Sequence, residues 1–309
     1  MDNIKKIGLT ALAGSLVASS VSAATLTATG SAGMSYTGGD EKKTQGQGWT
    51  MGDSITMSAS GDVNDIGVTL SFEIDNDDTG GGDVYDSHSI KFDLGDAGVL
   101  TFHGHGGSSA LGAKDDVMPA AWEEPWDILA GAEANLIGGA GGDNMFVYSY
   151  AHESGLTGTV SYVNAADAVT DVSSTSYGVE YTGMEGLTLG YATAEESTVA
   201  NTTDLFELTA ALTGKIGNFS YGYQREHIDL GQTTAATDAI FHNVETIGLA
   251  YAINDALSVS YNTIESKRHN VAFDNSYTTK TDAINFGYTV GGITLGSVSY
   301  THLTLPTKA

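Results

Sequence analysis

Six carboxylates gather in one irregular stretch of the chain, residues 106–143. They are Asp115, Asp116, Glu123, Glu124, Asp127 and Glu133. The bases Lys91, His103 and His105 precede them, and the carboxylates of Glu73, Glu180 and Glu207 lie on the polar side of alternating segments. Acidic groups that face basic groups across an opening create a transverse field, which orients dipolar solutes and sorts ions by charge. The alternative is that the six acids form an ordinary solvated loop surface.

Other chemistry has weaker support in the sequence. His103 and His105, at positions i and i+2, fit metal ligation, but no third ligand converges on them. The acidic run DNDDTGGGD, residues 75–83, is a candidate for a weak surface calcium site or a plain acidic loop, and it lacks the spacing of an EF-hand. No serine lies in a nucleophile elbow or triad context. We therefore expect no catalytic residues, no bound metal and no cofactor.

The segments that must position these groups alternate between apolar and polar residues with a period of two, which is typical of β-strands. In residues 24–38, for example, Leu26, Ala28 and Met34 share one face, and threonines and serines share the other. About fifteen such runs follow one another by this rule. Short turns alternate with longer polar loops between them. The sequence therefore predicts an all-β, antiparallel up-and-down meander.

The direction of the apolar face follows from the number of strands. A barrel of eight strands can just fill its interior with side chains, and the diameter grows with strand number. A barrel of about fifteen strands with inward leucines would enclose a large void. The apolar face is therefore expected to meet lipid, with tyrosines near the strand ends and a polar, wet lumen. A secreted β-helix is the alternative, but no fixed repeat period supports it.

Composition and the first residues indicate export. The chain has 309 residues, a formal net charge of −26 and no cysteine. This acidity argues against nucleic acid as a partner, because a binder must neutralise phosphates with Lys and Arg. Residues 1–23 combine two lysines, an apolar run and the small-residue site Val21-Ser22-Ala23, which is typical of a cleaved secretory signal peptide.

The order of these features resembles a known family. The start ATLTATGSAGMSYTG, the stretch GVLTFHGHGG before the long third loop, and the segments NMFVYSY and LTGTVSYVNA together resemble a Gram-negative general porin of the alphaproteobacterial type. The resemblance implies a trimeric outer-membrane barrel with about sixteen strands, whose third loop, residues 106–143, folds inward and narrows the pore.

The expected function is passive diffusion of ions and small hydrophilic solutes through a water-filled pore. The acidic excess predicts a preference for cations. The expected partners are outer-membrane lipid, further copies of the chain and the permeating solutes. An outer-membrane barrel enzyme, such as a protease or lipase, is one alternative, and a plugged structural or adhesin barrel is another.

The last residues, 298–309, break the pattern. The ending SVSYTHLTLPTKA loses the outward apolar rhythm and carries the only proline outside residues 106–143. Residues 298–307 also match the translation of a sequencing-library adapter. We therefore expect a barrel domain over residues 24–297 and a non-native tail over residues 298–309. A complete chain would have an even number of strands, as single-chain bacterial barrels do.

Overall fold

The computed structural model describes residues 7–9, 14–16, 25–37, 48–63, 65–75, 85–114, 117–122, 142–164, 173–196, 205–229, 239–270, 277–291 and 293–306. The strands are β1 (Ile7–Leu9), β2 (Gly14–Leu16), β3 (Thr25–Thr37), β4 (Gly48–Val63), β5 (Ile66–Asp75), β6 (Tyr85–Asp93), β7 (Val99–His105), β8 (Met145–Ala151), β9 (Leu156–Val163), β10 (Ser174–Met184), β11 (Leu187–Glu196), β12 (Leu205–Ile216), β13 (Phe219–Asp229), β14 (Ala239–Ala252), β15 (Leu257–Asn270), β16 (Tyr277–Val290) and β17 (Ile293–Pro306). Two 3-10 turns are η1 (Gly95–Ala97) and η2 (Gly112–Lys114). Within this part of the chain, no helix is long and apolar enough to cross a membrane.

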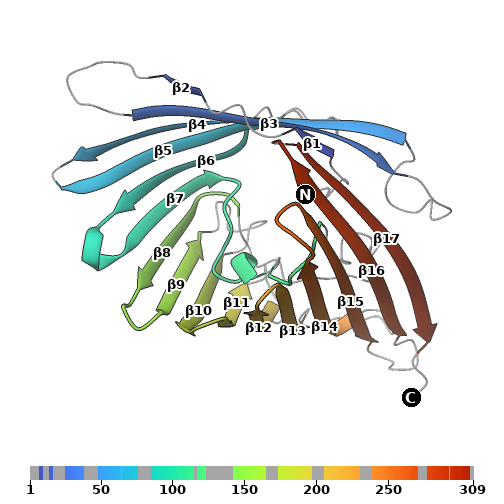
Figure 1. Cartoon of the computed structure of the whole chain (residues 1–309). Helices are drawn as coiled ribbons and strands as arrows, with labels where there is room; N and C mark the ends of the chain where they lie inside the picture. The colour runs from blue at the N-terminus through green and yellow to red at the C-terminus, as the bar shows by residue number, and fades with distance from the viewer. Residues whose placement is uncertain are drawn as a thin grey trace.

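Strands β3–β17 form one continuous sheet, in which each strand pairs antiparallel with the next along the chain. The sheet curls round a central space, and η2 lies inside the curve (Figure 1). The short strand β1 pairs with both β3 and β17, where the two ends of the sheet meet. These long strands confirm the predicted all-β, up-and-down meander of about fifteen strands. Strand β1 lies within the predicted signal peptide.

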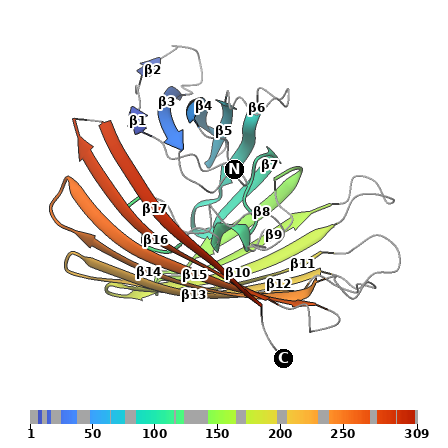
Figure 2. The ribbon, with the colours of Figure 1, turned by 90° about the vertical axis from the view of Figure 1, so that its right-hand side faces the viewer.

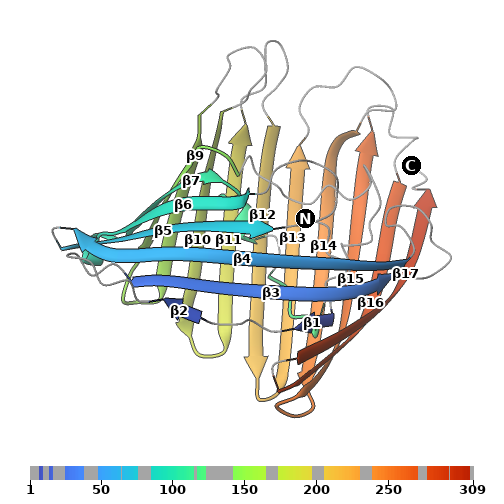
Figure 3. The same ribbon diagram turned by 90° about the horizontal axis from the view of Figure 1, so that it is seen from above.

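The two halves of the sheet differ in direction. Strands β10–β17 form a tall, tilted wall (Figure 2). Strands β3–β7 cross this wall at a steep angle when the sheet is seen from above (Figure 3). Such a change of direction is the accumulated right-handed twist of neighbouring strands, which also allows a sheet to close into a barrel.

The side chains divide between the two faces as the alternation predicts. Thr209, Gln224 and Asn262, on the inner face, are at most 1% exposed. On the outer face, Ile284 and Phe286 are 58% and 51% exposed. The predicted arrangement, with apolar side chains outward and polar side chains inward, is therefore confirmed.

Strand β17 contains residues 298–306 of the predicted non-native tail and pairs with β16 along its length. The register places Ser297 opposite Phe286 and Ser299 opposite Ile284, so both serines lie on the outer face. Val298, on the inner face, is only 7% exposed. The apolar alternation is thus reversed after Leu295. The non-native origin of the tail stays a prediction.

Candidate functional site

The long inserted segment between β7 and β8 is closed at its base by a pair of glycines. Gly107 and Gly142 form an isolated β-bridge, and the Gly107 amide donates to the Gly142 carbonyl at 3.1 Å. Gly142 has a φ of +107° and Gly106 a φ of +70°, which glycine adopts without strain. The chain therefore leaves the wall and returns to it at neighbouring points.

The first half of this segment lies against the inner face of the wall. We call residues 109–114 and 117–122 the inner strap. Its Ala110 amide donates to Ser161 Oγ of β9 at 3.1 Å, and its Leu111 amide donates to Ser176 Oγ of β10 at 3.4 Å. Leu111 is fully buried in a small apolar cluster with Ala192, Ala194 and Ile228. For the described residues of the third loop, these contacts confirm the predicted inward folding.

The strap continues across the tall wall with further hydrogen bonds. Gln224 Nε2 of β13 donates to the Lys114 carbonyl at 2.7 Å. Asn262 Nδ2 of β15 donates to the Pro119 carbonyl at 3.0 Å, and the Ala121 amide donates to Ser260 Oγ at 2.8 Å. Wall side chains therefore satisfy backbone groups of the strap that have no strand partner, as a buried backbone requires.

Four inward glycines leave the space that the far end of the strap occupies. We call Gly222, Gly248, Gly287 and Gly296 the glycine track. A Cβ atom on Gly222 would lie 2.7 Å from Pro119 Cδ, and one on Gly248 would lie 3.0 Å from the same atom. At Gly287 a Cβ would overlap the Ala121 carbonyl, and at Gly296 it would overlap the Trp122 ring. The track admits the strap only because these positions lack side chains.

The strap also carries a cation that the sequence analysis missed. Lys114 Nζ donates to Glu180 Oε2 of β10, and the Lys114 side chain is only 14% exposed. Glu180 therefore lies on the inner face, where the strap partly neutralises its charge. Glu207 is also inward and only 6% exposed. No local sequence pattern connects Lys114 with Glu180, because 66 residues separate the pair.

Opposite shifts in ion selectivity are expected when either partner of this pair is neutralised. Lys114→Gln removes a positive charge and leaves Glu180 free, so cation preference should rise. Glu180→Gln leaves Lys114 free, so cation preference should fall. Reversal potentials in a potassium chloride gradient measure both. Shifts of the same sign in the two variants would contradict a pair that faces the permeation path.

The predicted bases lie on strands β6 and β7. Lys91 pairs in register with Thr69 and Thr101, which places it on the inner face with an exposed side chain. His103 packs over Gly107 at the base of the loop. His105 Nδ1 lies 2.5 Å from Asp143 Oδ1, so this histidine contacts a carboxylate at the base of the loop.

Of the predicted inner-wall acids, Glu73 lies on β5 in register with Ser87.

Several other predicted groups fall outside the described residues. The six loop acids are outside the described part of the chain, and so is the candidate calcium segment after Asp75. These acids are Asp115, Asp116, Glu123, Glu124, Asp127 and Glu133. Among the described residues, no group of three or more His, Asp or Glu side chains could hold a metal.

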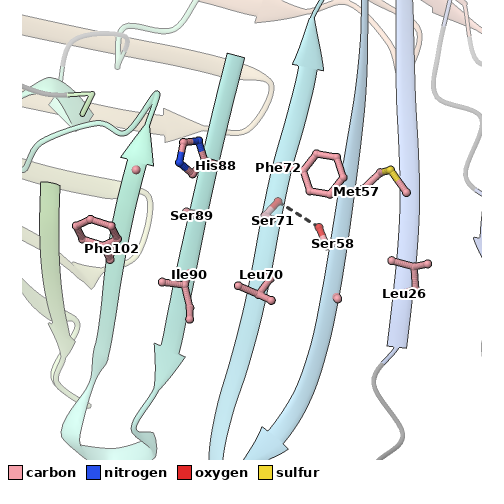
Figure 4. A pocket seen from close by; sticks show the side chains of 12 residues that line it. Leu26, Met57, Ser58, Leu70, Ser71, Phe72, His88, Ser89, Ile90 and Phe102 are labelled. Atoms are coloured by element: carbon pink, nitrogen blue, oxygen red, sulfur yellow. Dashed lines mark hydrogen bonds between the residues drawn. The ribbon is translucent and has the colours of Figure 1, made fainter. Parts of the chain in front are cut away.

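The outer face of β3–β7 carries an apolar cavity of about 430 Å³. One register row across these strands joins Leu26, Ala59, Leu70, Ile90 and Phe102. The next row includes Met57, Phe72 and His88, and Figure 4 shows the side chains of both rows around the cavity. Because its lining is mostly apolar, this surface suits contact with another apolar surface and not with a ligand dissolved in water.

Comparison with known proteins supports the family suggested by the sequence. A family model described as "Gram-negative porin" matches residues 8–304. No curated protein sequence matches significantly. The outer-membrane expressed OmpT of Vibrio cholerae superposes with a TM-score of 0.66 at 12% identity, over 94% of this chain and 90% of that one. An anion-selective porin from Comamonas acidovorans gives 0.57 at 13% identity, over 92% and 96%. A trimer form of Vibrio cholerae OmpT, folded in vitro, gives 0.59 at 12% identity, over 95% and 100%.

Proposed function

Since the chain belongs to the Gram-negative porin family, we propose that it is a general diffusion pore with a preference for cations. The protein is an outer-membrane β-barrel. It conducts ions and small hydrophilic solutes passively, without a covalent step. The observation that carries the proposal is the inner strap, which runs along a polar inner wall and narrows the space that the sheet encloses.

The charge of the chain supports the preference for cations. The net charge is −26, and the inner wall includes the carboxylates of Glu73, Glu180, Glu207 and Glu226, beside Lys91 and Arg268 of the wall and Lys114 of the strap. Such an excess raises the local cation concentration in a narrow, polar path. A porin with the same fold is described as anion-selective, so the fold alone does not set the sign. The side-chain charges decide it.

The loop acids are proposed to border the narrowest part of the path. They follow or interrupt the inner strap in the sequence, and the strap is fixed to the inner wall on both sides of Asp115 and Asp116. The reversal potential in a salt gradient also tests the variant in which Asp115, Asp116 and Asp127 are all replaced by asparagine. An unchanged reversal potential in that variant would place these acids away from the path.

We further propose that the barrel assembles as a homotrimer. Strands β7 and β8 have 7 residues each and β9 has 8. A strand needs about 9–11 residues to cross a bilayer alone. This part of the wall is therefore suited to contact another copy, and the apolar cavity on β3–β7 adjoins it. A trimer form of a protein with the same fold supports the assembly.

Conductance in a planar lipid bilayer tests the function. We expect stepwise conductance and a reversal potential with the sign of cation preference in a salt gradient. The preference should weaken at 1 M salt, where the Debye length is about 3 Å. Absence of conductance from folded protein would favour a plugged structural barrel or a barrel enzyme instead. Anion preference would contradict the role given to the carboxylates.

A further inference from the structure

A second cavity, of about 430 Å³, lies between the inner strap and the ends of β10–β13 that the short links 185–186 and 217–218 join. We call it the strap pocket. Val117 and Pro119 line it from the strap. Its polar lining residues on the strands and links include Glu185, Thr188, Thr213, Lys215 and Ser220. The volume is in the range of pockets that hold small molecules, which is about 300–1,000 Å³.

The strand register places the polar strand residues of the pocket on the inner face. Lys215 of β12 pairs with Ser220 of β13 in the row nearest their link. Thr213, two residues earlier on β12, has the same inward direction and belongs to the next row. The Lys215 amide donates to the Gly186 carbonyl at 2.8 Å, so Lys215 lies beside the link that carries Glu185. The pocket therefore has a cation and an anion at the same border.

The polar side chains of the strap pocket are not committed to one another. Lys215 and Glu185 are both exposed, and in the described part of the chain neither forms an ion pair. The hydroxyls of Thr188, Thr213 and Ser220 likewise form no hydrogen bond with another described residue. A hydroxyl can both donate and accept, and an ammonium group can donate three hydrogen bonds. A ligand with matching groups therefore finds its partners available.

Charges of both signs at one border favour a zwitterion over an ion of a single sign. Lys215 can donate charge-assisted hydrogen bonds to a carboxylate, and such bonds are about twice as strong as neutral ones. The hydroxyl of Ser220, its register partner, is a further donor for the same group. Glu185 accepts hydrogen bonds from an ammonium group, whereas it repels a simple anion. Val117 and Pro119 provide an apolar side, which suits an aliphatic side chain.

The connections between the strands identify the end of the barrel at which the pocket lies. The links 185–186 and 217–218 border it, and residues 291–292 form another short link at the same end. The opposite end has longer connections, such as residues 230–238 and 271–276. Bacterial barrels have short periplasmic turns and longer extracellular loops. The strap pocket therefore lies on the periplasmic side of the inner strap.

We propose that the strap pocket binds a small zwitterionic solute, an α-amino acid with an aliphatic side chain, with its carboxylate on Lys215 and its ammonium group toward Glu185. The proposal rests on the proposed pore, because the pocket borders the path of the solutes. The chain has 12 Lys and Arg against 38 Asp and Glu, so its negative potential repels carboxylates in general. Lys215 gives the carboxylate of a zwitterion a local partner where the solute leaves the strap.

Saturation-transfer difference NMR of the folded full chain in uncharged, deuterated detergent tests the proposal with leucine as the probe. We expect transfer to the leucine methyl groups that saturates with leucine concentration. Leucinamide lacks the carboxylate and 4-methylpentanoate lacks the ammonium group. Each should therefore bind about tenfold more weakly than leucine, the effect of losing one charge-assisted hydrogen bond. Equal binding of the three compounds, or no binding of leucine, would overturn the proposal.

Two variants assign the charges of the ligand to their partners. Lys215→Gln should bind leucine about tenfold more weakly and should no longer distinguish leucine from leucinamide. Glu185→Gln should no longer distinguish leucine from 4-methylpentanoate. Lys267→Gln, which removes an exposed lysine from the outer face of β15, is the matched control and should bind normally.

Normal binding of leucine by folded Lys215→Gln protein would contradict the proposed site. Because this assay does not involve conduction, its outcome is independent of the bilayer test. A pore that conducts without binding leucine would overturn this inference and leave the proposed function intact. A barrel that binds leucine in the strap pocket without conducting would do the reverse.

Discussion

Valine in place of Gly222 and Gly248 is expected to force the inner strap off the wall and to lower the single-channel conductance. A Cβ atom at either position reaches Pro119 at 3.0 Å or less, before the two further methyl groups of valine are counted. The strap can only move toward the lumen, since the wall is fixed by strand pairing on both sides. The double variant should also lose about 1–3 kcal/mol of stability, the usual cost of overpacking.

Gly158→Val is the matched control for this change. Gly158 is the third residue of β9, on the outer face with Leu156 and Val160, and a Cβ atom there would meet nothing within 4 Å. Valine favours strands, so this variant should keep both the stability and the conductance of the parent protein. Thermal unfolding and bilayer conductance measure the two effects. If the glycine-track variant conducts like the control, then the strap is not fixed by close contact with these glycines.

Period-two alternation was enough to predict the strands, the lipid-facing side and the place of the inserted loop. These features are local, since each strand carries its own pattern of outward apolar and inward polar residues. The register confirms it at Tyr221, Gly222 and Tyr223, where the two aromatic side chains point outward and the glycine inward. Gly287 has the same pattern between Phe286 and Tyr288, and Gly248 lies between the outward aliphatic residues Ile247 and Leu249.

The place where the inner strap lies on the wall could not be predicted from this alternation. The Ala121 amide and Ser260 Oγ are separated by 139 residues, and the Pro119 carbonyl and Asn262 by 143. No local period connects such partners. The inward glycines are visible in the sequence as gaps in the polar face of their strands, but alternation alone does not say what fills these gaps. An inward glycine between two outward aromatic residues is instead a signal that another part of the chain approaches the wall.

Loss of stability is expected when arginine replaces Phe286, at the centre of the outer apolar band of β16. Phe286 is 51% exposed on the outer face, between the charged positions Lys280 and Asp282 above and Val290 at the short turn below. A charge at the midplane of the lipid must be stripped of water or must draw water into the bilayer. Phe286→Arg should therefore lower the free energy of unfolding in lipid vesicles by about 2–4 kcal/mol.

Val290→Arg provides the comparison on the same strand and the same face. Val290 is 53% exposed next to the short turn, where an arginine side chain reaches the interface and its water. Its substitution should cost only about 0–1 kcal/mol. Urea titration of both variants, folded in the same vesicles, measures the difference directly. Equal costs at the two positions would mean that the apolar side chains of β16 do not face lipid, and the orientation of the whole wall would have to be reversed.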